Sequence, residues 1–275
     1  MTRSVRMNRL FFSAVTLCLI SHLGSIPALG KGGDEPPRPA FENVKPKPGT
    51  IIADPAAAAK RIKTIGKNEF ELGSITFNSD TREVSVPCSV NMRDGAVEYA
   101  LVHETGKTHE SILKTAAAAV DLQVAMLLTN YQPGHTGLFS YQKDEKIRKK
   151  MEETAPKTPG GNLVQLFVEW KDGDAVKRVP LREWMIDPRT KKVPTSFDHW
   201  VFNGSMIQES GFSAQLYGSF VGTYYDVTAI INCPSKDNLV DDIWSVNARV
   251  MPKIDTSVKL IIAPFSPVAS SSAKP

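Results

Sequence analysis

Two histidines and two glutamates lie within eight residues of one another, in the segment HETGKTHE at residues 103–110. Imidazole nitrogens and carboxylate oxygens are common zinc ligands, and the same groups serve as general acids and bases. The residue types in this segment therefore suit two kinds of chemistry, metal binding and metal-assisted hydrolysis. It does not contain the H-E-x-x-H pattern that places two histidines on one face of a helix.

The flanking residues predict an antiparallel hairpin. Ala96–Glu104 and Lys107–Lys114 are strand-like runs separated by Thr105-Gly106, and a two-residue loop ending in glycine is typical of a tight hairpin turn. Side chains alternate along a strand, so the hairpin would place His103 and Glu110 on one face. His109 and Glu104 would share the other face, which excludes one metal bound by both histidines.

Two His–Glu diagonals remain in this register, His103 with Glu110 and His109 with Glu104, each within reach across the strands. Glu110 lies on the more apolar face and is expected to need a partner there. Three interpretations stay open: a structural pair at the end of a sheet, a ligand or metal site completed by His135 or His199, and catalysis. The candidate ligand-binding or functional group is therefore His109, Glu110 and His103, with no catalytic residue and no metal ligand assigned.

Signatures of several enzyme classes are absent. The segment nearest to G-x-S-x-G, Gly211–Gln215, lacks the closing glycine, and Gly106-Lys107-Thr108 has Leu101 where a phosphate-binding loop needs its first glycine. Beyond Cys18, near the N-terminus, the chain has two cysteines, too few for a four-cysteine iron–sulfur cluster. No cofactor is predicted.

The elements that would position these residues are mostly strands. Hairpins are predicted for Ser74–Phe77 with Glu83–Val90, where Pro87 indicates an edge position or a bulge, and for Asn162–Trp170 with Ala175–Leu181 around Asp172-Gly173. An apolar helix capped by Thr115 is predicted at about 115–130 and should be buried. Further predicted strands are His199–Ile207, Ala214–Phe220, Thr223–Cys233 and Ser257–Ala263. The predicted fold class is α+β: a largely antiparallel sheet built from hairpins, with one buried core helix.

The N-terminus has the pattern of a cleavable signal peptide. Arg3, Arg6 and Arg9 precede the apolar run Leu10–Leu23, and the small residues before Lys31 suit cleavage after Gly30. The expected division is a signal peptide at 1–30, a Pro-rich linker and short helix at 31–66, and one domain at 67–265 with a charged insertion near 140–161. A small-residue tail follows at 266–275. The expected location is secreted or periplasmic, with no membrane span after cleavage.

The two remaining cysteines, Cys88 and Cys233, could form a disulfide in an oxidising compartment. The loop closed by this bond would stabilise the fold by roughly 5 kcal/mol in the chain-entropy model. Two buried thiols are the alternative, and the sequence leaves both open.

The charge of the chain does not indicate a protein that binds nucleic acid or a membrane surface. The net charge of +4 falls to +1 once the three arginines of the signal peptide are removed, and 41% hydrophobic residues with 23% charged ones are ordinary globular values. The expected partner is an unidentified protein of the cell envelope or a small ligand.

Several segments together resemble the YdjY-type domain of exported bacterial proteins. They are GKTHESILKT at 106–115 with the apolar helix after it, Trp170–Gly173, Trp200–Ser205 and the closing strand Ser257–Pro264. The resemblance covers roughly Phe70–Pro264 and implies no established activity. Some members are described as ferredoxin-like, and this chain departs from them because it lacks the cysteines. The residues matching the family pattern are Gly106, Lys107, His109, Glu110 and Ser111.

The export signal, the linker and the incomplete catalytic set favour a non-enzymatic binding or structural module. The alternative is a metal-dependent hydrolase that uses Glu110 with His109 or His103.

Overall fold

The computed structural model describes residues 60–134, 145–146, 149, 163–194, 197–235, 238 and 243–265. The expected signal peptide, the tail, His135, most of the linker and all but three residues of the charged insertion lie outside the described residues.

Sixteen strands have described bounds, together with two α-helices and three 3₁₀ helices. The strands are β1 (Lys63–Gly66), β2 (Glu69–Leu72), β3 (Ile75–Asn78), β4 (Val84–Val90), β5 (Tyr99–His103), β6 (Ser111–Thr115), β7 (Leu163–Asp172), β8 (Ala175–Pro180), β9 (Met185–Ile186), β10 (Trp200–Phe202), β11 (Ile207–Gln208), β12 (Gly211–Phe212), β13 (Ser219–Gly222), β14 (Ile231–Asn232), β15 (Ser245–Val246) and β16 (Ser257–Pro264). The helices are α3 (Ala119–Leu128), α5 (Ser213–Tyr217), η1 (Thr108–Glu110), η2 (Leu181–Trp184) and η3 (Ala248–Val250).

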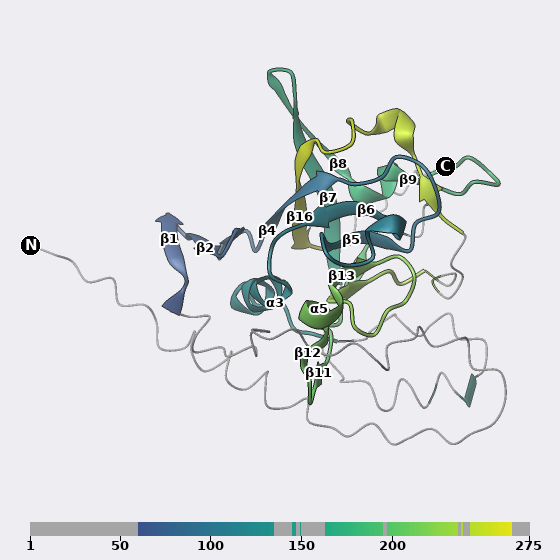
Figure 1. Ribbon diagram of the computed structural model, residues 1–275. Coiled ribbons are helices and arrows are strands. Elements are labelled where there is room, and N and C mark those ends of the chain that lie inside the picture. The colour runs from purple at the N-terminus through teal and green to yellow at the C-terminus, as the bar shows by residue number, and fades with distance from the viewer. Residues whose placement is uncertain are drawn as a thin grey trace, which may run out of the picture.

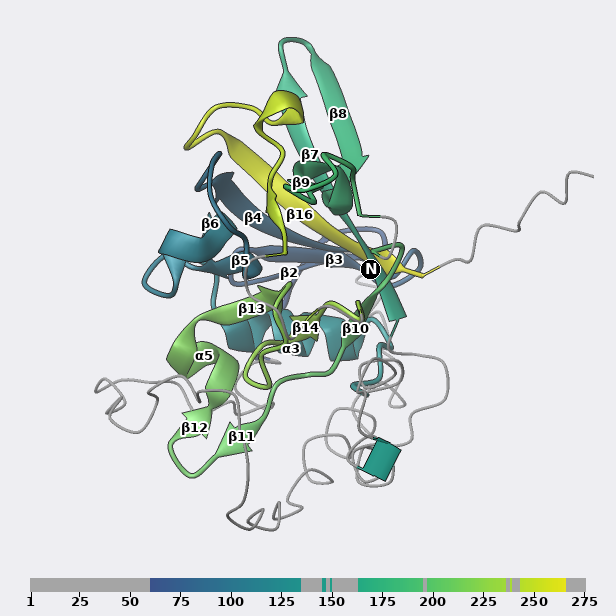
Figure 2. The same cartoon turned by 90° about the vertical axis from the view of Figure 1, so that its right-hand side faces the viewer.

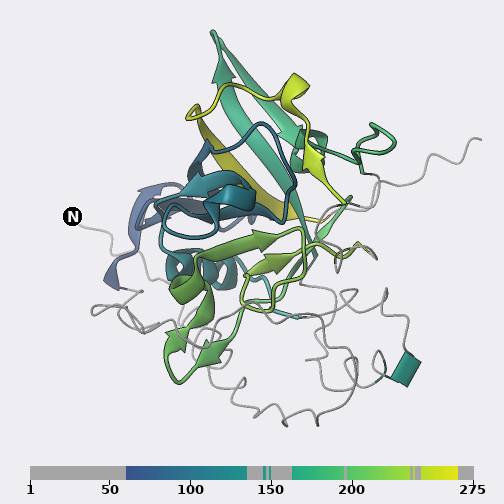
Figure 3. The same cartoon turned by 45° about the vertical axis from the view of Figure 1, so that its right-hand side comes forward.

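Eight of the strands close into a barrel (Figures 2 and 3). They follow the order β4-β16-β7-β10-β14-β13-β5-β6, and β6 pairs back onto β4. The pairs β5–β6 and β13–β14 are parallel, and the other six pairs are antiparallel. The predicted α+β class is therefore wrong: the described residues are mostly β, a closed mixed barrel to which two short α-helices with described bounds are added. Closure depends on pairing between strands far apart in sequence, which local patterns do not reveal.

The predicted core helix is only one short element of this β fold. Helix α3 begins four residues later than predicted, because Thr115 ends β6 and donates its hydroxyl to the carbonyl of Pro87 at 2.6 Å. The helix packs against β3, β4 and α5, and it lies beside α5 in Figure 1. All its residues except Leu128 are buried. Arg82 secures its C-terminal end by donating to the carbonyls of Thr129 (2.8 Å) and Asn130 (3.0 Å).

The two other predicted hairpins are confirmed, whereas two of the predicted strands are largely wrong. Strands β3 and β4 form the first predicted hairpin, and β7 and β8 form the second around Gly173, which has a φ of 62°. The predicted strand Ala214–Phe220 is wrong in its first part, which is helix α5. The predicted strand Thr223–Cys233 is wrong except at β14, since the residues before it form a loop.

Pro87 lies where β4 changes partner along one edge. Strand β3 pairs with β4 as far as Ser85, and β6 pairs with it from Ser89 onward. Between these two contacts no neighbour needs the N–H that proline lacks. The predicted edge position is wrong, because β4 pairs with β16 along one side and with β3 and β6 along the other.

The predicted hairpin at residues 96–114 is wrong, because β5 and β6 run parallel. Tyr99 pairs with Ser111 and Leu101 with Leu113, so residues 104–110 must carry the chain back along β5. We call this segment the first return loop. The side chain of Asn91 holds it by donating to the carbonyls of Thr108 (2.6 Å) and Ser111 (2.7 Å).

A close backbone approach also holds the first return loop. A Cβ at Gly106 would lie 3.1 Å from the carbonyl oxygen of His103 and 3.3 Å from that of Gly218. Gly106 is needed for this contact and not for the positive φ of a hairpin turn. The predicted two-residue hairpin turn at Thr105-Gly106 is wrong, because the strands on either side of it are parallel.

Cys88 and Cys233 are both buried and are not joined by a disulfide in the structure, and their pairing in an oxidising compartment stays a prediction. Cys88 lies in β4 opposite Val258 of β16, and burial raises the pKa of its thiol to about 12. Cys233 directly follows β14.

Within the described residues, no helix is long and apolar enough to cross a membrane.

We predict that Gly106→Ala lowers the free energy of unfolding by about 1–3 kcal/mol, because the added methyl group presses on backbone atoms that cannot move independently. The matched control is Gly66→Ala, whose Cβ would come nearest to the carboxylate end of the flexible Glu69 side chain. We expect this control to change stability by less than about 0.5 kcal/mol. Urea denaturation measures both, and equal losses would contradict the proposed backbone contact.

Candidate functional site

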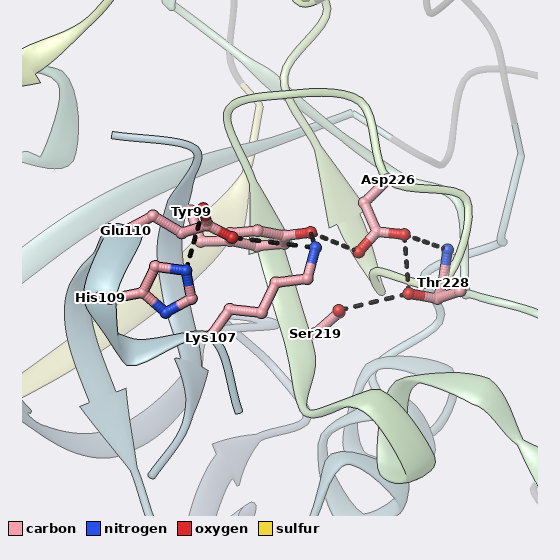
Figure 4. Close-up of polar contacts among 7 residues, drawn as sticks. All are labelled: Tyr99, Lys107, His109, Glu110, Ser219, Asp226 and Thr228. Carbon is pink, nitrogen blue, oxygen red and sulfur yellow. Dashed lines mark hydrogen bonds and ion pairs between the residues drawn. The ribbon is translucent and has the colours of Figure 1, made fainter. Parts of the chain in front are cut away.

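Two loops of similar construction meet beside β5. The first return loop joins the parallel strands β5 and β6, and residues 223–230 join the parallel strands β13 and β14. We call residues 223–230 the second return loop. Because β5 and β13 are neighbours in the barrel, side chains from both loops can reach Tyr99 at the start of β5 (Figure 4).

A line of polar contacts crosses from one loop to the other. The ammonium group of Lys107 donates to the Tyr99 hydroxyl at 2.6 Å, and this hydroxyl donates to Oδ2 of Asp226 at 2.8 Å. The other oxygen of Asp226 accepts from the backbone N–H and the hydroxyl of Thr228, both at 2.7 Å (Figure 4). The Asp226 carboxylate is therefore held by three hydrogen bonds, one of them from outside its own loop.

Two buried asparagines support the backbone around Asp226. The N–H of Asp226 donates to the side-chain oxygen of Asn232 at 2.9 Å, and the Asn232 amide donates to the Asp226 carbonyl at 2.9 Å. The same amide donates to Asn203 at 2.8 Å. Buried polar networks of this kind hold a loop rigid when their members are satisfied.

Tyr99 is held in its protonated form. Its side chain is almost fully buried, and burial raises the pKa of the phenol well above its usual range. The negative charge of Asp226 and the hydrogen bond to it raise this pKa further, and Glu110 and Glu98 act in the same direction. The phenol therefore acts as a hydrogen-bond donor at neutral pH and not as a base.

The outer end of the line reaches solvent. Glu110 lies 3.8 Å from the Lys107 ammonium and 3.5 Å from Nε2 of His109. The side chain of His109 is 79% exposed, whereas that of Glu110 is 18% exposed. The site thus runs from an exposed imidazole, through a carboxylate and an ammonium group, to a buried phenol and carboxylate.

The structure brings together two of the three candidate residues from the sequence. His109 and Glu110 contact one another as chain neighbours, whereas the predicted diagonals paired His109 with Glu104 and Glu110 with His103. His103 instead accepts a hydrogen bond at Nδ1 from the backbone N–H of Thr105, at 3.2 Å. The ring of His199 packs against Phe265 with centroids 5.0 Å apart, and burial lowers the pKa of this histidine.

A metal site would need more ligands than His109 and Glu110 provide. Within the segments that the structure describes, no three His, Cys, Asp or Glu side chains are grouped so that they could hold an ion. His135, one of the residues considered for completing such a site, lies outside those segments.

Sequence reasoning missed Tyr99 and Asp226 as members of the site. Tyr99 lies within the predicted strand Ala96–Glu104, and Asp226 lies within the predicted strand Thr223–Cys233. A carboxylate inside such a strand was the one available signal, since an acidic side chain in an apolar stretch needs a partner. Its partner, Tyr99, is 127 positions away in the sequence.

The arrangement suits binding better than proton abstraction. Its buried carboxylate is engaged by three donors, and its phenol remains protonated. Its outer groups offer a ligand hydrogen-bond donors and acceptors on a loop supported from within the barrel. Such support is what a preorganised binding surface requires.

We predict that Tyr99→Phe lowers the free energy of unfolding by about 1–3 kcal/mol, because it leaves buried Asp226 and Lys107 without their shared partner. The control is Tyr131→Phe, which removes one hydrogen bond to the backbone carbonyl of Arg82 and should cost about 0.5–1.5 kcal/mol. Urea denaturation of the two variants gives the comparison. A loss at Tyr99 no larger than that at Tyr131 would contradict the coupling between the loops.

Comparison with known proteins gives one family. A family model described as the YdjY domain matches residues 75–263, which include both return loops and all eight barrel strands except the C-terminal residue of β16. No curated protein and no solved structure matches the chain. Since the match covers well over half of the sequence, the chain belongs to the YdjY domain family.

Proposed function

We propose that this chain is an exported cell-envelope domain that binds a partner or ligand without catalysing a reaction, and that the first return loop forms its binding surface. The observation that carries the proposal is the line of contacts from exposed His109 to buried Asp226. One end of this line is accessible to a ligand, and the other end is anchored in the barrel.

The loop is supported at three points, which favours a surface of fixed shape. Gly106 packs on Gly218, Asn91 holds the carbonyls of Thr108 and Ser111, and Lys107 reaches Tyr99. A loop fixed in this way loses little conformational entropy when a partner binds. The exposed groups of Glu104, Thr105 and His109 are then presented in one arrangement.

The export part of the proposal is supported by the N-terminal sequence. Three arginines, an apolar run and small residues before Lys31 follow the order of a signal peptide. The Pro-rich residues after Lys31 would separate the domain from the membrane during export.

A reporter fusion tests export. Residues 1–66 are fused to a reporter enzyme that becomes active only when its disulfides form outside the bacterial cytoplasm. We expect activity with the native residues and a mature N-terminus at Lys31. The control carries Leu17→Arg and Leu19→Arg, which interrupt the apolar run and should abolish activity. Equal activity in both fusions, or a protein that still begins at Met1, would contradict cleavage after Gly30.

Site-specific crosslinking tests the binding surface. A photoreactive amino acid is placed at His109, and the control position is Val176, which is 63% exposed in β8. We expect a discrete crosslinked product in cells from position 109 and none from position 176. Absence of a product from position 109, or the same product from both positions, would contradict a binding surface at this loop.

The alternative is a metal-dependent hydrolase, and it is favoured by the 3.5 Å contact between His109 Nε2 and Glu110. Metal analysis of protein purified without chelator separates the two functions. We expect no stoichiometric metal in the wild type, in Glu110→Gln, or in the control Glu104→Gln. Stoichiometric zinc that is lost in Glu110→Gln and kept in Glu104→Gln would contradict the binding module and support the hydrolase.

A further inference from the structure

We draw no further inference here: the strongest candidate, the pair of buried indole N–H groups of Trp184 and Trp244 that lack a hydrogen-bond acceptor in the aromatic cluster beside β9 and β15, carries nothing, because each tryptophan already makes a T-shaped contact with another ring, Trp170 or Phe197, and nothing in the structure shows a ligand between them.

Discussion

The hydrogen bond from Tyr99 to Asp226 connects the start of β5, beside the first return loop, with the second return loop. Neighbouring parallel strands need a connection that brings the chain back to its starting end, usually through a helix and a dozen or more residues. Here two such connections are short loops, at residues 104–110 and 223–230. Short returns bury polar backbone and side chains, so each must find partners inside the protein. The two loops satisfy this need partly through each other, with Lys107 and Tyr99 on one side and Asp226 on the other.

Barrel closure imposes a second constraint, at β4. This strand pairs with β16 along one edge and is shared by β3 and β6 along the other. Pro87 at the change of partner lacks an N–H, and its carbonyl accepts from Thr115 at the end of β6. The parallel β5–β6 pair is thereby attached to β4 and the strands beyond it. The position of the first return loop therefore depends on the closure of the barrel as well as on the contacts of the loop itself.

Local patterns predicted the features that depend on neighbours in the sequence. The Asp172-Gly173 hairpin, the strand at Ser257–Pro264 and a buried helix after Thr115 follow from turn chemistry and apolar runs. The same reasoning failed at Thr105-Gly106, where the glycine serves a contact with Gly218, 112 positions away. It selected His109 and Glu110 but paired each with another residue, His109 with Glu104 and Glu110 with His103, across a hairpin that does not exist. The sequence did not predict that Tyr99 and Asp226 belong to the site, because only the pairing of β5 with β13 brings their two segments together.

The strand order β6-β5-β13-β14 has the same pattern of directions from either end: parallel, antiparallel, parallel. The two return loops are therefore alike in architecture but unlike in chemistry. One presents an imidazole and an ammonium group, and the other contributes a buried carboxylate and Val227, which is 44% exposed. A partner that contacts both loops would meet a near-symmetric framework with asymmetric groups. The surface could thus distinguish one orientation of that partner from its reverse.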